Sequence, residues 1–436
     1  MTEVTMRKVT KILLKTLSVA LLFLIFCPIA ITLVVELPSV QDFLIGKATS
    51  LVSNKIGTRI EVKHLRVGVL GGVTLDGVYV EDFDQDTLLY VERLHVNLLR
   101  INDDATLSLR GGYVRNGMLH IHEASNGEMN IKQVVDSFVN RDKERKGNFS
   151  LSLKNINLSN FDLIIERREH REPEYGIDYY DMHIENISGE VDNLALQGGV
   201  IDGHISDFSF VEHTGFEVNN FTGDFSVDRG KLRFHNVDII STQSYIHLAD
   251  FALLGDSWSE YKDFIHNVRL EGEVTASAIS TDDIAHFAPR LLPWQLTATD
   301  VKASVSGYVS DLKVNVGNLN FGESGSLQGN VRLRGLPDVK RGRMTLDLKH
   351  LKSNAEDAVL LLESIAGITI NGKALDAAKA AGQIVLAGEF DGGMSRFEGD
   401  VTVTTDAGVA ALRALRTPLN VEKGQNPVAA LQAHAD

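Results

Sequence analysis

Two histidines have the spacing of a metal-binding pair. His120 and His122 flank Ile121, so both would lie on one face of a strand and could supply two metal ligands. No third ligand is evident near them in the sequence. Histidines that face solvent are therefore the better interpretation, and we predict no metal site.

Three aspartates have the spacing that opens a calcium loop. Asp82, Asp84 and Asp86 alternate as the first ligands of an EF-hand would, but that loop needs Gly at position 87 and Glu at position 93. The chain has Thr87 and Arg93 there. The acidic run therefore predicts a solvated hairpin turn.

Motifs of the common enzyme classes are missing from the sequence. It contains no P-loop, no G-x-G-x-x-G, no G-x-S-x-G, no H-E-x-x-H and no cysteine pair. We therefore expect no catalytic residue, no cofactor and no enzymatic activity.

The net charge is -15, and residues 1–15 carry +3, which leaves -18 for the rest. Such an acidic chain is not expected to bind nucleic acid.

An uncharged run from Thr16 to Val35 is long enough to cross a membrane, since about 20 apolar residues span the hydrocarbon core. Basic residues precede the run and Glu36 is the first charge after it, which predicts a cytoplasmic N-terminus and export of the remaining chain. The predicted anchor residues are Leu17, Leu21, Leu22, Phe23, Leu24, Ile25, Phe26, Ile29, Leu33 and Val34.

Two other interpretations of this run fit less well. A cleaved signal peptide needs small residues at its cleavage site, and the residues around Ala30 are bulky. Lipoprotein processing at Cys27 would need a small residue where Phe26 stands. Because Cys27 is the one cysteine of the chain, the exported part has no disulfide, which suits a bacterial envelope protein.

Residues 37–57 have apolar positions at a helical spacing. We predict a helix that starts after Pro38 with Ser39 as its cap and stops at Gly57. It is either an amphipathic helix that leaves the bilayer or a packing helix with no membrane role. Residues 1–36 then form the cytoplasmic tip and anchor.

From Thr58 the apolar residues mostly alternate, which predicts strands with one apolar and one polar face. We divide this part into 58–140 and a repetitive region, 149–405. The alternation slips at Gly77 and at Glu92 and Arg93, as it would at a bulge that keeps the apolar face on the inside of a curving sheet. The residues predicted to line that inner face are Val73, Leu75, Val78, Val80, Leu94, Val96 and Leu98.

Two repeats appear within the second region. An apolar-x-Gly-x-apolar signature recurs, for example around Gly272, Gly329 and Gly388, and suggests regular bends or close approach of backbones. Helical interruptions near 280–290 and 353–366 repeat after roughly seventy-five to eighty residues, as in an elongated array. For 406–436 we predict an irregular tail with a short helix near Ala410 to Leu415.

The order of these segments resembles the AsmA-like family, and most closely its TamB type. The resemblance is carried by GTRIEVKHLRV from Gly57, VTLDGVYVED from Val73, DTLLYVERLHVNL from Asp86 and NGEMNI from Asn126, all after the N-terminal anchor. TamB-type proteins are usually longer and have a C-terminal domain that engages an Omp85-type outer-membrane barrel. This chain ends before such a domain, so that barrel is a doubtful partner here, and the tail looks like that of a truncated product or a short paralogue.

The resemblance implies a mostly β fold: one N-terminal transmembrane helix, then an elongated repetitive sheet folded into a groove, called a β-taco and similar to a β-solenoid, with short helical interruptions. It implies a single-pass bacterial inner-membrane protein whose bulk is periplasmic. Its expected partners are the inner membrane and phospholipid acyl chains, and its expected function is phospholipid transport between the membranes and outer-membrane protein assembly. The alternative is a non-transporting envelope scaffold with a closed, dry β core.

Overall fold

The computed structural model describes most of the chain. The described residues are 34–68, 72–101, 106–131, 150–167, 174–178, 180–197, 200–287, 295–336, 341–366, 376, 379–380, 382–393, 397–406, 408–416 and 429–435. The chain forms two compact units: unit 1 comprises Met1–Arg171 and Tyr179–Gly198, and unit 2 comprises Glu172–Asp178 and Gly199–Asp436. The boundary predicted between 140 and 149 lies outside the described residues.

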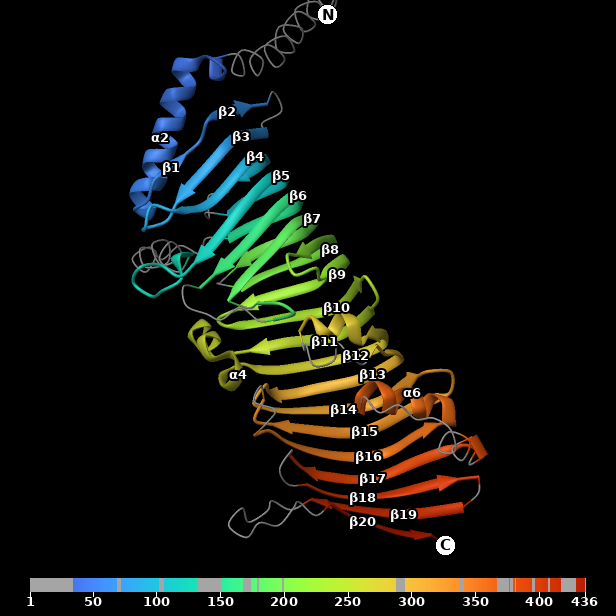
Figure 1. Cartoon of the computed structure of the whole chain (residues 1–436). Helices are drawn as coiled ribbons and strands as arrows, with labels where there is room; N and C mark the ends of the chain where they lie inside the picture. Colours follow the sequence, from blue (N-terminus) through green and yellow to red (C-terminus); the bar gives the residue numbers. More distant parts are fainter. Residues whose placement is uncertain are drawn as a thin grey trace, which may run out of the picture. The chain divides into compact units, whose positions relative to one another are not determined.

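Unit 1 is a mixed sheet that follows one helix. Its elements are α2 (Pro38–Ile56), β1 (Ile60–Glu61), β2 (His64–Val67), β3 (Gly72–Glu81), β4 (Thr87–Ile101), β5 (Thr106–His122), β6 (Ser150–Glu166) and β7 (Asp181–Gln197). β1 and β2 both pair with β3, and β3, β4 and β5 are antiparallel neighbours. β5 and β6 are parallel, and β7 is antiparallel to β6. The labels in Figure 1 follow this order.

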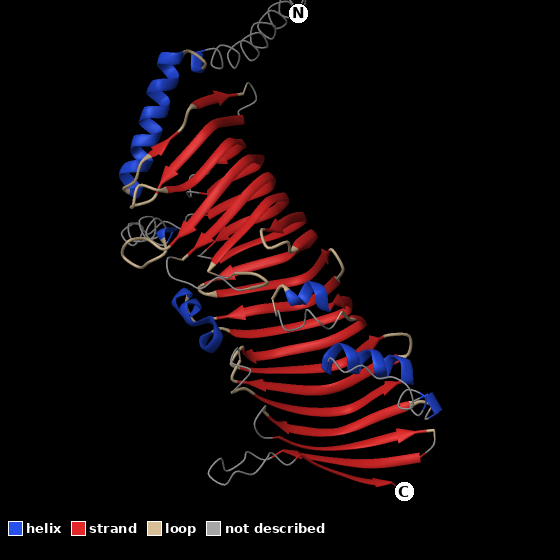
Figure 2. Ribbon diagram, in the orientation of Figure 1, coloured by secondary structure: helices blue, strands red, loops and turns tan. Residues whose placement is uncertain are grey.

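Unit 2 is an antiparallel meander with short helices between some strands (Figure 2). Its elements are β8 (Val200–Glu212), β9 (Glu217–Asp228), β10 (Lys231–Ser241), β11 (Tyr245–Leu254), η1 (Trp258–Asp263), α4 (Phe264–Asn267), β12 (Arg269–Ser280), α5 (Thr281–Ala285), β13 (Thr297–Tyr308), β14 (Asp311–Phe321), β15 (Gly325–Arg334), β16 (Arg343–Ser353), α6 (Ala355–Ala366), β17 (Ile384–Gly392), β18 (Phe397–Thr405), β19 (Gly408–Arg416) and β20 (Ala429–Ala435). Each strand pairs with the next one along the chain. The predictions of a mostly β chain and of few helices are confirmed.

Helix α2 has the predicted end but not the predicted cap. Gly57 closes the helix in the left-handed conformation (φ 91°), and its N–H donates to Ser53 O. Leu37, not Ser39, is the N-cap residue, and its apolar side chain has no atom that could accept a capping hydrogen bond. Pro38 occupies the first helical turn, where its missing N–H costs nothing.

The predicted anchor run lies almost entirely outside the described residues. Of the ten anchor residues only Val34 is described, and it is 51% exposed. Within the described part of the chain, no helix combines the length and the apolar character needed to cross a membrane.

The prediction of an irregular or helical tail is wrong for the described part of 406–436. Residues Gly408–Arg416 and Ala429–Ala435 are strands, and β19 pairs with β18 at nine successive positions. Alanine favours a helix, and in an alanine-rich strand the alternation of apolar and polar residues is not visible. An available edge of the sheet overrides that weak preference, since pairing and packing decide strand formation.

Bends in the strands explain why the apolar pattern slips. Gly77 (φ 63°) lies between two register pairs of β3 and β4, opposite Glu92, and Asn116 and Asn160 follow on β5 and β6 with φ of 50° and 54°. Asn116 Nδ2 donates to Glu92 Oε2 (2.6 Å), and Asn160 Nδ2 donates to Asn116 Oδ1 (3.0 Å). This ladder crosses unit 1 where the strands change phase, and it confirms the bend predicted at Gly77 and Glu92.

The bend yields a stability prediction at Asn160. Asn160→Val should lower the free energy of unfolding of unit 1 by about 2 kcal/mol, because a β-branched residue disfavours positive φ and the amide bond to Asn116 is lost. Asn160→Gly loses the same hydrogen bond, but glycine adopts a positive φ without strain. The loss of unfolding free energy should therefore be about half as large. Urea unfolding followed by far-UV circular dichroism measures both. Equal costs would show that the left-handed backbone is not the cause.

Helices α5 and α6 occupy equivalent places in unit 2, each after the second strand beyond a hairpin turn. The third residue of each helix is a buried aspartate that binds that turn. Asp283 Oδ2 accepts hydrogen bonds from Ser241 Oγ (2.6 Å) and Gln243 N (3.1 Å). Asp357 accepts from the backbone N–H groups of Glu323 (2.9 Å) and Ser324 (2.7 Å). The two predicted helical interruptions are thus real, and each one ties a turn of the sheet in place.

Candidate functional site

The main feature of unit 2 is a row of apolar or glycine positions that crosses twelve strands, β8 to β19. The members are direct register neighbours from strand to strand. The row, called here the apolar row, consists of Gly203, Phe225, Phe234, Phe251, Gly272, Val305, Val314, Val331, Leu346, Phe390, Gly399 and Ala414. A single polar residue would interrupt it, and none does.

The register row beside it, on the opposite face of the same strands, is polar at every position. Because alternate residues of a strand point to opposite faces, the next register row lies on the other side of the sheet. It consists of His204, Asp224, His235, Asp250, Glu273, Ser304, Asn315, Asn330, Asp347, Glu389, Asp400 and Arg413. His204 and Asp224 contact each other (2.7 Å), and Asn330 donates to Asp347 (3.0 Å).

Charge pairs extend the polar face beside this row. The Arg343 guanidinium donates to Asp391 from the neighbouring strand (Nε to Oδ1, 2.8 Å). This hydrogen bond lowers the pKa of Asp391 from its usual value to about 2, with a smaller contribution from Thr345. The polar face of unit 2 is therefore a solvated, charged surface. The apolar row lies on the opposite face, whose side chains would be stabilised by removal from water.

The described structure does not cover the apolar row with a second layer. The strands make their main contacts with their hydrogen-bonded neighbours, and α5 and α6 contact the sheet through β12 and β16. The side chains from Phe225 to Phe390 are accordingly half-buried rather than buried. A half-covered apolar face of this length is a candidate binding surface.

Glycines let neighbouring strands approach closely along this face. A Cβ on Gly388 would lie 2.1 Å from Asp400 O, and one on Gly329 would lie 2.7 Å from Asp347 O. Both glycines pair with Leu348 of β16, one from each side. The recurring glycine signature therefore marks close backbone approach, as predicted.

In unit 1 the structure brings together most of the residues predicted to line a groove. The register pairs are Val73 with Val96, Leu75 with Leu94, Val78 with Val91 and Val80 with Leu89. Val73, Leu75, Val78, Val80, Leu94 and Val96 are half-buried. Leu98 pairs with Leu109 through the backbone, and its side chain lies outside the described residues. These pairs place the predicted residues on neighbouring strands, on both sides of the bend at Gly77.

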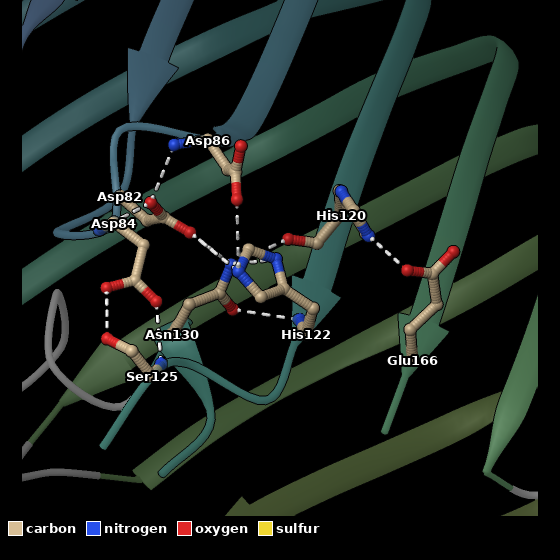
Figure 3. Close-up of polar contacts among 8 residues, drawn as sticks. All are labelled: Asp82, Asp84, Asp86, His120, His122, Ser125, Asn130 and Glu166. Carbon is tan, nitrogen blue, oxygen red and sulfur yellow. Dashed lines mark hydrogen bonds and ion pairs between the residues drawn. The ribbon is translucent and has the colours of Figure 1, made fainter. Parts of the chain in front are cut away.

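The aspartate run is a turn, but it is not simply solvated. Asp82 is 2% exposed; its Oδ1 accepts hydrogen bonds from the N–H groups of Asp84 and Asp86 (2.9 Å each), and its Oδ2 accepts one from Asn130 Nδ2 (3.0 Å). Figure 3 shows this network beside His122, whose Nε2 lies 3.1 Å from Asp82 Oδ2. The run closes the β3–β4 hairpin and fixes the Asn130 loop to it.

The interpretation of both histidines as solvent-facing is wrong for His122. His122 is 9% exposed, since the Asp82 turn and the Asn130 loop cover it. His120 remains partly exposed and contacts Glu166 at 3.1 Å (Figure 3). This contact could not be predicted, because Glu166 lies on β6, which is the parallel neighbour of β5.

A second group near His120 was not recognised from the sequence. Glu166, Asp181 and His183 offer ligand atoms that all lie within 4.8 Å of one another. Glu166 ends β6 and Asp181 begins β7, and the two are register partners. The Asp-x-His spacing at 181–183, which places both side chains on one face of a strand, was the available signal.

Comparisons with known proteins found no matching family model, no matching curated protein and no matching solved structure.

Proposed function

We propose that the apolar row of unit 2 and the paired apolar residues of unit 1 hold the acyl chains of phospholipids. The observation that carries this proposal is the apolar row itself, which is uninterrupted across twelve strands and half-exposed from Phe225 to Phe390. An acyl chain needs only apolar contact and no hydrogen-bond partner. A protein ligand would need partners for its own backbone, and the row offers no polar side chain for them.

The energetics favour a mobile ligand. Burial of each methylene group contributes ~0.8 kcal/mol, so an acyl chain laid on the row could offset its removal from a bilayer. Successive positions along the row are chemically alike. No single position would therefore trap the chain, which is the property that transport requires and a deep specific pocket lacks.

The cellular setting is part of the same proposal. The apolar run 16–35 would anchor the chain in the bacterial inner membrane, with residues 37 onward in the periplasm. In this setting the protein would be an AsmA-like conduit that carries phospholipid toward the outer membrane and so supports outer-membrane protein assembly. The two amphipathic sheets and the N-terminal apolar run support this assignment.

A lipid-transfer assay tests the proposal. The full chain is reconstituted in donor vesicles that contain a fluorescent phospholipid, and transfer to acceptor vesicles is followed with time. We expect transfer above the protein-free rate for the native chain and for Asn97→Asp, and a rate close to the protein-free one for Val96→Asp. Val96 is half-buried beside Val73, and Asn97 is the exposed next residue, so the two variants add one charge to opposite faces. Transfer at the protein-free rate by the native chain would favour a scaffold.

A further inference from the structure

The Glu166, Asp181 and His183 group lies where three strands of unit 1 end. Glu166 is the last residue of β6, and Asp181 and His183 occupy the first and third positions of β7. His120 of β5 contacts the group from the other side of β6. A hollow of about 420 Å³ beside the group is lined by His120, His122, Glu166 and Asp181, among others.

Two of the three separations between the ligand atoms are close to those of a tetrahedral metal site. His183 Nε2 lies 3.1 Å from Asp181 Oδ1 and 3.5 Å from Glu166 Oε1. Zinc binds histidine nitrogen at 2.0–2.1 Å and carboxylate oxygen at a similar distance, which sets neighbouring ligand atoms about 3.3 Å apart. The observed separations fall on either side of that value.

The orientation of Asp181 also points to a shared ligand. Its Oδ1 atom is closed off from solvent and accepts no hydrogen bond among the described residues, although it lies 3.1 Å from His183 Nε2. Such an atom is usually satisfied by a hydrogen bond or an ion. A metal ion between Asp181 and His183 would satisfy it.

His120 is not one of the three ligands, but it contacts one of them. Its Nε2 contacts Glu166 Oε2 (3.1 Å), the carboxylate oxygen that does not face His183. A metal-binding carboxylate is commonly held by such an outer hydrogen bond, which orients the oxygen that binds the ion. His120 is thus a positioning residue for Glu166.

We propose that Glu166, Asp181 and His183 bind a divalent transition-metal ion of the zinc type, with one coordination position open to solvent. The histidine nitrogen selects such an ion over calcium or magnesium, which prefer oxygen ligands. The ion would join the end of β6 to the start of β7, where Arg167 N donates to Tyr180 O (2.7 Å). This site is independent of the apolar row.

Titration of the metal-free full chain with Zn²⁺ in the calorimeter tests the proposal. We expect one site in the native chain, and a loss of affinity of at least about 100-fold in Asp181→Asn and in His183→Ala, each of which removes a direct ligand. His120→Ala should lose about 10-fold, the lower end of the range for an outer hydrogen bond. His204→Ala is the matched control, because His204 forms a histidine–aspartate pair with Asp224 on unit 2.

Each outcome decides the question. Native circular dichroism of every variant establishes that the chain is folded before titration. Absence of Zn²⁺ binding by the folded native chain at submillimolar Zn²⁺ overturns the site. Binding that persists in both Asp181→Asn and His183→Ala, or that is lost equally in His204→Ala, overturns it as well.

Discussion

Val305→Asp is expected to cut the phospholipid that co-purifies with the full chain by at least about tenfold, while Ser306→Asp leaves it unchanged. A charge that an acyl chain must cover costs at least about 1.4 kcal/mol, which corresponds to a factor of ten. Lipid extraction from the purified chain, followed by mass spectrometry, gives the amount of lipid per protein.

Val305 suits this test because of its surroundings. It lies near the middle of the apolar row, between Gly272 and Val314. It is half-buried, and Gly272 presents no side chain beside it, so water can reach a carboxylate there. The chain should therefore stay folded. Ser306, the next residue, is exposed on the polar face and receives the same charge.

Two results would contradict this account. If Val305→Asp unfolds the chain and Val314→Asp does so too, the apolar row is a dry core that cannot hydrate. If both variants fold and keep the native amount of lipid, the row is not the lipid-binding surface.

Asp357→Ala is expected to lower the free energy of unfolding of unit 2 by about 3 kcal/mol. Asp357 is 4% exposed, and its loss leaves the N–H groups of Glu323 and Ser324 without their charged acceptor. Hydrogen bonds to a charged group contribute about 1.5–3 kcal/mol each, and unsatisfied buried donors add to the cost. Both tryptophans, at positions 258 and 294, belong to unit 2 in the sequence, so their fluorescence during urea unfolding measures the effect.

Glu356→Ala is the neighbouring control. Glu356 is exposed and contacts Lys379 (3.3 Å) at the surface, so its removal should change the stability of unit 2 by less than about 0.5 kcal/mol. If the two variants unfold at the same urea concentration, the aspartate does not hold the β14–β15 turn.

The same aspartate predicts a dependence on pH. Burial raises the pKa of Asp357, but the hydrogen bonds from Glu323 and Ser324 lower it by a larger amount. The pKa of Asp357 therefore lies below the ordinary value of 3.8. A depressed pKa in the folded state gives stability that is complete above the unfolded pKa and is lost as the pH falls through the folded one. The native chain should therefore lose stability below about pH 4. Asp357→Asn should lose less over the same range, and an identical loss would remove Asp357 as the cause.

The strands and their bends could be predicted because they are local. The alternation shows directly in residues such as Val73 and Leu75. It slips by one position at Gly77, and a bend of the strand at this residue keeps the apolar residues on one face. The aspartates that begin α5 and α6 could be located as helix starts. Their hydrogen bonds to turns two strands away could not be predicted, because these bonds depend on which hairpin lies beside each helix.

The histidine and carboxylate group escaped sequence analysis for a topological reason. His120 and Glu166 meet because β5 and β6 are parallel, whereas the alternation in both strands fits either direction. His122 was misjudged for a similar reason, since the loop that carries Asn130 folds back over it. The tail was misjudged because alanine at positions 410, 411 and 414 fits both a helix and a strand.

Site-specific photocrosslinking in living cells tests the central claim most directly. A benzophenone amino acid replaces Val305 or Leu346 on the apolar row, or Ser306 or Thr345 on the polar face, in cells grown with radiolabelled phosphate. The account predicts that the first two positions of the full chain capture labelled phospholipid after irradiation and that the last two do not. Equal capture on both faces, or none on the apolar row, would contradict it.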